Sequence, residues 1–397
     1  MVIKKEQHIG SGGYGCVVFP SLPCKNNETM ELVKYLGEMT EKAIENSKLT
    51  KTDYKKRVGK IMKKKNAHEE FLIAKELEKG GLLPKDEILL CKPAVLGLKR
   101  NLPNCSSNKL KSQDTNDLRL ILPKYRGIAL NKVIKENKFK KISAKKLYQA
   151  FSDDVLQFIK KLNRHTKSNK ITRFIHGDLK NGNILFDIKT KKFTVIDYGF
   201  TELYDHLFDN RLYRQAYFVF PFDYGIIGLI YKYRTVDVNE IIKKIVDYVD
   251  KRRTEYIPPK SISRLKHNEM GKKRALLAID NLKKNFKKTI IKSIRIHDAK
   301  DKELGKRFDV FGLGYVLNNI MRKMDKDFDI YQETKDNNKL TVKQKKLKEF
   351  YKELKKLISL CLNNNIITYP NMRNFIGNQT PTIREMDKKL KELIKIL

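Results

Sequence analysis

The sequence lacks a long apolar run, cysteines at paired spacing, and enough acidic residues to balance its bases. Its longest mainly apolar stretch, 218–231, is interrupted by Pro221 and Asp223 and is too short to span a bilayer. The N-terminal residues contain no apolar core of signal-peptide length. We therefore expect a soluble, intracellular protein without a membrane span.

The five cysteines are scattered, and none forms a C-x-x-C pair. This spacing argues against a zinc site or a disulfide framework and fits a reducing compartment. The 397 residues are 40% hydrophobic, which is typical of a globular chain long enough for two lobes or domains.

The formal net charge is +39, from 85 basic and 46 acidic residues. A surface this basic attracts polyanions such as nucleic acid, anionic lipid or acidic protein. A coding bias toward lysine, asparagine and isoleucine is a second explanation, although such bias would also add glutamate. The region 251–295 holds 15 Lys or Arg against three acids, so we expect any non-specific polyanion attraction to involve it.

The segment Phe174–Phe186 carries polar groups at short offsets between apolar runs: Asp178, Lys180 and Asn183. A carboxylate there can take a hydroxyl proton, a cation can neutralise phosphate oxygens, and an amide can hold a metal. Fourteen residues after Asn183, a buried-looking strand ends in Asp197. The two segments together indicate phosphoryl transfer.

A glycine-rich stretch, Gly10–Gly15, precedes a β-favouring run that Pro20 closes. This context predicts a hairpin tip rather than the strand-to-helix turn of a dinucleotide-binding fold. Backbone amides at such a tip can approach phosphates, and Val17 can cover an adenine face. An ordinary glycine-rich hairpin is the alternative.

Further along, residues 31–36 read as a strand with Lys34 at its centre, and residues 38–65 as an exposed lysine-rich insertion. A helix follows from His68 to Leu77, with Glu70 beside its apolar stripe. After a strand at 117–122, the pattern breaks at Pro123–Gly127, which suits a hinge. The remainder is mainly helical.

In order and spacing, these segments resemble the eukaryotic-type protein kinases. Gly10–Val17 matches their glycine-rich loop, and His176–Asn183 matches their catalytic loop. Asp197-Tyr-Gly199 corresponds to their metal-binding triplet, and Asp309–Gly314 to the helix whose aspartate braces the catalytic loop. The lysine-rich style is most similar to divergent serine/threonine kinases of large DNA viruses, which would place the protein in host cytoplasm or virion.

The resemblance implies an α+β, bilobal protein-kinase fold. A β-rich N-lobe with one main helix would span 1–126, with an insertion at about 38–65. A mostly helical C-lobe would span 127–397, with the catalytic loop at 174–186 and a basic insertion at about 224–300. ATP would lie in the cleft beneath the glycine-rich loop.

The resemblance also implies residue roles and the cofactors ATP and Mg²⁺. Asp178 would accept the proton of a serine or threonine hydroxyl, Lys180 would stabilise the γ-phosphoryl charge, and Asn183 with Asp197 would hold Mg²⁺. Lys34 would hold the α- and β-phosphates, paired with Glu70 or, less favoured by the helix phase, its neighbour Glu69. Further nucleotide contacts are implied at Ile9, Gly10, Ser11, Gly12, Gly13, Tyr14, Gly15, Cys16 and Val17, and structural roles at His176, Gly199 and Asp309.

Two departures from the family pattern matter. Gly177 replaces the arginine that reads activation-loop phosphorylation, so we expect activity without that modification. No Ala-Pro-Glu triplet occurs between Gly199 and Asp309, which weakens the implied recognition of peptide substrates.

Other readings share some of these motifs. His-Gly-Asp also begins the catalytic loop of small-molecule kinases of the aminoglycoside and choline type, and of atypical RIO-like kinases. Lys180, two residues after the catalytic aspartate, favours a serine/threonine protein kinase. A pseudokinase scaffold is a further alternative, although no metal-binding or base residue is missing.

Overall fold

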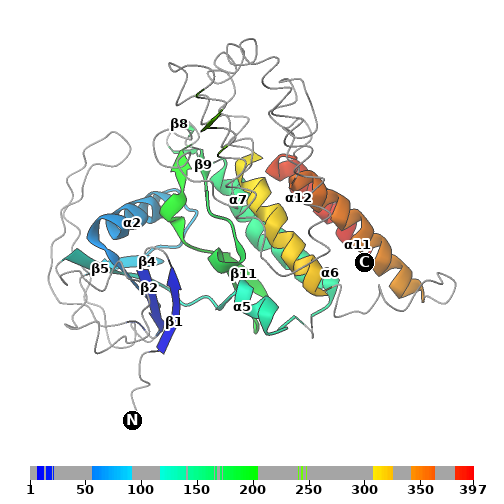
Figure 1. Ribbon diagram of the computed structural model, residues 1–397, viewed down its shortest axis with the longest axis horizontal. Helices are drawn as coiled ribbons and strands as arrows, with labels where there is room; N and C mark the ends of the chain where they lie inside the picture. The colour runs from blue at the N-terminus through cyan, green and yellow to red at the C-terminus, as the bar shows by residue number, and fades with distance from the viewer. Residues whose placement is uncertain are drawn as a thin grey trace. The chain divides into compact units, whose positions relative to one another are not determined.

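The protein is described by a computed structural model that divides into two units. One comprises Met1–Arg126 with Asp197–Gly199, and the other comprises Gly127–Ile196 with Phe200–Leu397. The residues that the structure describes are 7–12, 15–19, 21, 56–91, 117–139, 142–164, 166–167, 170–171, 173–203, 240, 243–244, 247, 307–324, 341–362 and 381–397. Strands and helices occur in both, which confirms the mixed α+β class (Figure 1).

The first unit is built on a five-stranded antiparallel sheet in the order β1-β2-β3-β5-β4. Its strands are β1 (Gln7–Gly12), β2 (Gly15–Phe19), β3 (Gly59–Lys63), β4 (Ile88–Cys91) and β5 (Leu118–Pro123). Apolar side chains of β2, β3, β4 and β5 form a buried cluster. Helix α2 (Lys64–Lys79) buries Phe71, Ala74 and Leu77, the stripe that the sequence predicted.

The position of β3 corrects our prediction that residues 38–65 form an exposed insertion. β3 is the central strand of the sheet, paired with β2 on one side and β5 on the other. Gly59, Ile61 and Met62 are buried, and α2 starts directly afterwards at Lys64. The abundance of lysine hid this short strand, because its apolar positions are few and lie between cations.

The cysteines give a second correction. Cys16 on β2 and Cys91 on β4 each take part in a disulfide, whereas the sequence analysis argued against a disulfide framework. Cys361 is a buried free thiol. Spacing along the chain was a poor guide here, because a disulfide depends on which cysteines the fold brings together and not on a C-x-x-C pattern.

The second unit contains short strands and most of the helices. A three-stranded sheet has the order β11-β10-β6, and two further pairs are β12-β9 and β7-β8. The strands are β6 (Ile128–Ala129), β7 (Thr166–Lys167), β8 (Lys170–Ile171), β9 (Phe174–Ile175), β10 (Ile184–Asp187), β11 (Lys192–Val195) and β12 (Glu202–Leu203). The short helices are α5 (Leu130–Lys135), η3 (Asn181–Asn183) and η4 (Tyr198–Phe200), the last of which straddles the boundary between the units.

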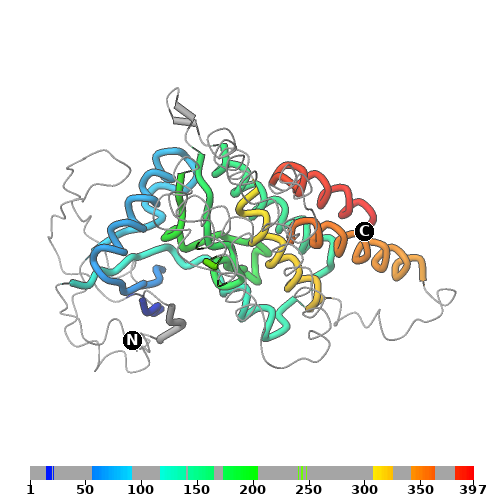
Figure 2. The backbone as a smooth tube through the Cα atoms, turned by 45° about the horizontal axis from the view of Figure 1, so that its top comes forward, coloured from blue at the N-terminus to red at the C-terminus, as the bar shows by residue number. Residues whose placement is uncertain are grey.

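The longer helices of the second unit pack side by side. One continuous helix consists of α6 (Ala144–Ala150), a π-helical segment η2 (Phe151–Leu156) and α7 (Gln157–Leu162). Helix α12 (Ile383–Ile394) packs against this helix and against α11 (Val342–Cys361), as Figures 1 and 2 show. None of the helices in the described ranges is both long and apolar enough to cross a membrane.

A helix over residues 307–324 approaches the loop that connects β9 to η3. Gly312 allows this, since a Cβ at that position would lie only 2.6 Å from the carbonyl oxygen of Leu179. At the start of the same helix, the carboxylate of Asp309 accepts hydrogen bonds from the backbone N–H groups of His176 (2.8 Å) and Gly177 (3.0 Å). The helix therefore fixes the backbone of this loop.

Gly177 has a conformation that disfavours any other residue. Its φ is +75°, and a Cβ would overlap the carbonyl oxygen of Phe200. The left-handed region costs an L-residue roughly 1–2 kcal/mol, even before the overlap is relieved. The local backbone therefore accounts for a glycine here.

We predict that Gly177→Ala lowers the free energy of unfolding by about 2 kcal/mol or more, from strain and overlap together. Gly182→Ala, in the same loop, is the matched control because its nearest non-neighbouring atom is Lys180 Cε at 3.9 Å. Denaturant unfolding of both variants measures the difference. Equal stability of the two variants would contradict the account.

Candidate functional site

Three of the predicted residues are hydrogen-bonded to one another in the second unit. The Asp178 carboxylate is buried, and its Oδ2 accepts hydrogen bonds from Lys180 Nζ (2.8 Å) and Asn183 Nδ2 (2.7 Å). Asn183 Nδ2 also donates to the carbonyl oxygen of Asp178 at 2.9 Å. The short helix η3 produces this geometry, because it curls the chain so that Asn183 returns to Asp178. We call these residues the Asp178 cluster.

His176 is hydrogen-bonded to the backbone of the Asp178 cluster. Its side chain is fully buried, and its Nδ1 accepts a hydrogen bond from the backbone N–H of Asp178 at 3.3 Å. This assigns the ring proton to Nε2, which lies 3.1 Å from the carbonyl oxygen of Ile196 and donates to it. His176 is thus a structural residue that links the loop to the chain leaving β11.

Asp309 holds the same loop from the adjacent helix, at the backbone of His176 and Gly177. Burial raises the pKa of Asp309, while its electrostatic interaction with His176 and the two backbone hydrogen bonds act in the opposite direction. Two N–H donors compensate the carboxylate for its lost hydration. The structure therefore places Asp309 where the sequence analysis expected a brace.

A second group of residues lies in the first unit and is centred on Lys60 of β3. The ammonium of Lys60 is 2.7 Å from Glu70 Oε2 and 2.7 Å from Asp197 Oδ1. β3 and α2 supply the lysine and Glu70, and Asp197 follows β11 in the chain with a φ of +68°. We call Lys60, Glu70 and Asp197 the Lys60 cluster.

The Lys60 cluster is held together by charge in a largely dry environment. The side chain of Glu70 is 4% exposed and that of Lys60 is 18% exposed. Burial disfavours the ammonium, but attraction by Asp197 and Glu70 exceeds this effect and raises the pKa of Lys60 above its usual range. Lys60 is therefore a permanent cation that carries two carboxylate partners.

This geometry corrects the prediction that Lys34 pairs with Glu70. The partner is Lys60, ten residues before Glu70 in the chain, whereas Lys34 lies outside the described residues. Sequence reasoning missed Lys60 because it treated the surrounding lysines as a solvated insertion. A usable signal was present: Lys60 alternates with buried Gly59 and Ile61 immediately before the helix that carries Glu70.

The glycine-rich stretch forms an antiparallel hairpin, as its context predicted. Ile9, Gly10, Ser11 and Gly12 lie in β1, and Gly15, Cys16 and Val17 lie in β2, whereas Gly13 and Tyr14 fall outside the described residues. Gly15 passes so close to β3 that a Cβ would overlap the carbonyl oxygen of Ile61. The Cys16 side chain is buried in the sheet core, so only its backbone can face a nucleotide.

Gly199 lies beside the Lys60 cluster. A Cβ at this position would be 3.6 Å from Glu70 Oε2 and 3.7 Å from Asp197 Oδ1, which is ordinary contact. The neighbouring Tyr198 is buried, and this burial raises the pKa of its hydroxyl. The predicted basic region 251–295 and most of the predicted insertion 224–300 lie outside the described residues.

The donor atoms fit a magnesium ion, which prefers oxygen ligands and is commonly held by one or two protein groups plus phosphates and water. Asn183 uses its Nδ2 in both of its side-chain hydrogen bonds, and no donor among the described residues reaches its Oδ1. The Asp197 side chain is 32% exposed. Each residue therefore offers an oxygen of the required kind.

We predict that Lys60→Met lowers the phosphoryl-transfer rate by about 10²–10³-fold, the usual cost of removing one group that stabilises transition-state charge. Lys34→Met is the matched control and should stay within about twofold of the unmodified protein. Steady-state kinetics with varied ATP measure both variants. Loss of activity in Lys34→Met, with Lys60→Met unaffected, would overturn the assignment of Lys60.

Comparison with known proteins gave a match over the part of the chain that contains the Asp178 cluster. A model of the Phosphotransferase enzyme family matches residues 137–213, a segment that includes the Asp178 cluster and Asp197. A search of curated proteins gave no match. The family match spans less than half of the chain, and it indicates a kinase-like protein with phosphotransferase activity in general.

Proposed function

We propose that the protein transfers the γ-phosphoryl group of ATP to serine or threonine hydroxyls of protein substrates. The observation that carries the proposal is the Asp178 cluster, in which one buried carboxylate, one cation and one amide meet within a single turn of chain. Phosphoryl transfer requires little covalent chemistry from the protein, so positioning and charge stabilisation supply most of the catalysis. These groups suit that task.

In this proposal Asp178 accepts the proton of the attacking hydroxyl. Its Oδ2 is held by Lys180 and Asn183, which fixes the orientation of the carboxylate. Lys180 stabilises the charge on the transferred phosphoryl group, which its position two residues after the base allows. His176 and Asp309 keep the loop in place without contacting the substrate.

The nucleotide is assigned to groups of the other unit. Lys60 takes the role first assigned to Lys34 and holds the α- and β-phosphates, and Glu70 positions it through their ion pair. Backbone amides of the β1–β2 hairpin would add contacts, since glycines there permit a close approach.

Asn183 and Asp197 would hold Mg²⁺, which neutralises phosphate charge when bound. Asp197 is also paired with Lys60, which has Glu70 as its second partner, so the residue that would contribute an oxygen to the ion lies beside the lysine assigned to the phosphates.

Small-molecule phosphorylation is a second candidate, favoured by the family match over residues 137–213. The two candidates share the Asp178 cluster and differ in the acceptor. We favour a protein acceptor because Lys180 stands two residues after Asp178, a position at which the resemblance to serine/threonine protein kinases implies a lysine.

We predict that the protein, given Mg²⁺, γ-labelled ATP and a mixture of soluble proteins, forms phosphoserine or phosphothreonine. Lys180→Ala should lower kcat by about 10²–10³-fold because it removes charge stabilisation from the transition state. Lys189→Ala, an exposed lysine on the following hairpin, should have no effect.

Phosphoamino-acid analysis of the labelled proteins identifies the acceptor. The same reaction with a panel of amino alcohols and aminoglycosides tests the second candidate. Label found only in these small molecules would reject the protein-kinase assignment while leaving the general activity in place.

A further inference from the structure

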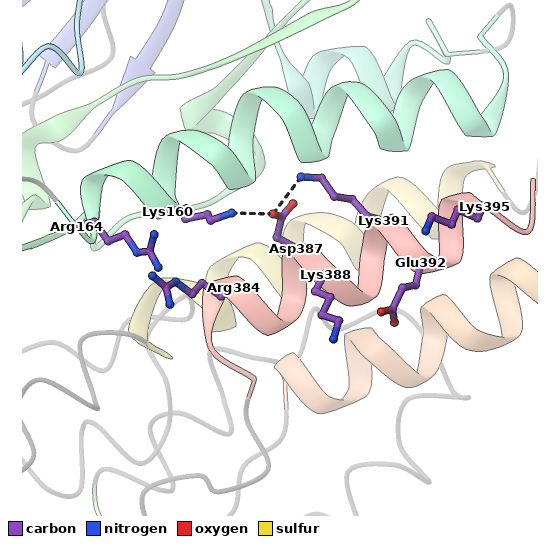
Figure 3. Close-up of a pocket in the computed structure, with 8 residues that line it drawn as sticks. All are labelled: Lys160, Arg164, Arg384, Asp387, Lys388, Lys391, Glu392 and Lys395. Carbon is purple, nitrogen blue, oxygen red and sulfur yellow. Dashed lines mark hydrogen bonds and ion pairs between the residues drawn. The ribbon is translucent and has the colours of Figure 1, made fainter.

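A basic pocket of about 580 Å³ lies along helix α12, where it faces α7 (Figure 3). Its lining is charged throughout. We define the α12 basic pocket by the cations that line it: Lys160, Arg164, Arg384, Lys388, Lys391 and Lys395. The pocket is separate from the region 251–295 that the sequence analysis singled out.

The floor of the α12 basic pocket is a buried carboxylate, Asp387. It accepts hydrogen bonds from Ser152 Oγ (2.8 Å) and Gln157 Nε2 (2.8 Å), and it pairs with Lys160 and Lys391, each at 3.2 Å. Burial by itself would raise the pKa of Asp387, but these donors outweigh it and hold the pKa below its usual value. Asp387 therefore stays ionised and joins α12 to the helix η2–α7.

Asp387 forms ion pairs with only two of the cations that line the pocket, Lys160 and Lys391. Arg384, Lys388 and Lys395 are exposed and form no ion pair within the part of the chain that the structure describes. The only other acid in the lining is the exposed Glu392. The pocket thus carries an excess of positive charge that its own residues do not neutralise.

The geometry of these cations is suited to phosphates. Figure 3 shows the side chains of Arg164 and Arg384 pointing toward one another, although both are cationic. Guanidinium groups bind phosphate oxygens in a bidentate manner, so two converging guanidinium groups can share one phosphate. Arg384 and Lys388 on α12 and Lys395 at its C-cap span 11 residue steps, or about 16 Å at the rise of a helix. This row is longer than one phosphate requires.

We propose that the α12 basic pocket binds the phosphate backbone of a nucleic-acid strand. Small organic ligands are usually held by apolar and aromatic walls with a few polar groups. This pocket has no such wall among its lining residues, so it can recognise charge but not a base or a ring. The net charge of +39 adds long-range attraction for the same class of ligand.

The test uses the full chain and a labelled 20-nucleotide DNA, single-stranded and duplex, in fluorescence anisotropy titrations at several salt concentrations. The variant R384A/K388A/K395A removes three exposed cations from the pocket. The control K343A/K346A/K352A removes three exposed lysines from α11, so both variants lose the same charge. Thermal unfolding of both variants verifies that each remains folded.

We expect the pocket variant to bind DNA at least tenfold more weakly. The slope of log affinity against log salt should fall by about two to three, because each lost phosphate contact contributes about 0.7 to 0.9. The α11 control should remain within about threefold of the unmodified protein.

Equal weakening of both variants would overturn the proposal, because total charge rather than the pocket would then explain binding. Inorganic tripolyphosphate and poly-glutamate are titrated in the same way. Pocket-dependent binding of either one, without pocket-dependent DNA binding, would assign the pocket to a different polyanion and would also overturn the proposal.

Discussion

The Asp178 cluster depends on the buried carboxylate of Asp309, which accepts two consecutive backbone N–H groups from His176 and Gly177. A loop cannot hold three polar side chains in register unless its backbone is fixed, because each free residue costs about 1–2 kcal/mol of conformational entropy to order. Gly177 completes the arrangement, since its left-handed backbone permits the turn beside Phe200. The folded protein therefore holds this loop in an ordered conformation before any substrate binds.

The first unit keeps the ammonium of Lys60 charged in a largely buried environment. Lys60 is stabilised by Glu70 and Asp197, and removal of the lysine would leave the buried carboxylate of Glu70 without the cation that pairs with it. The strand that carries Lys60 is central in the sheet, so its position is set by pairing on both edges. In both the Asp178 cluster and the Lys60 cluster, a fixed backbone thus holds a cation and a carboxylate within hydrogen-bonding distance.

Sequence reasoning succeeded where function depends on short offsets and failed where it depends on tertiary contacts. Asp178, Lys180 and Asn183 could be predicted to lie together because five residues of chain separate the outer two. Lys60 was missed among its neighbouring lysines, because the strand that carries it is short and its contact with Asp197 spans 137 residues of chain. The α12 basic pocket is another case, since Asp387 reaches Lys160 across 227 residues.

The central proposal, that the Asp178 carboxylate accepts the proton of the attacking hydroxyl during phosphoryl transfer, is tested most directly by Asp178→Asn, with ATP affinity and transfer measured separately. Asp153→Asn, an exposed acid on η2, is the control. The account predicts that Asp178→Asn binds ATP within about threefold of the unmodified protein but transfers phosphate about 10²–10⁴-fold more slowly, the usual contribution of a positioned base. Undiminished transfer by Asp178→Asn would contradict it.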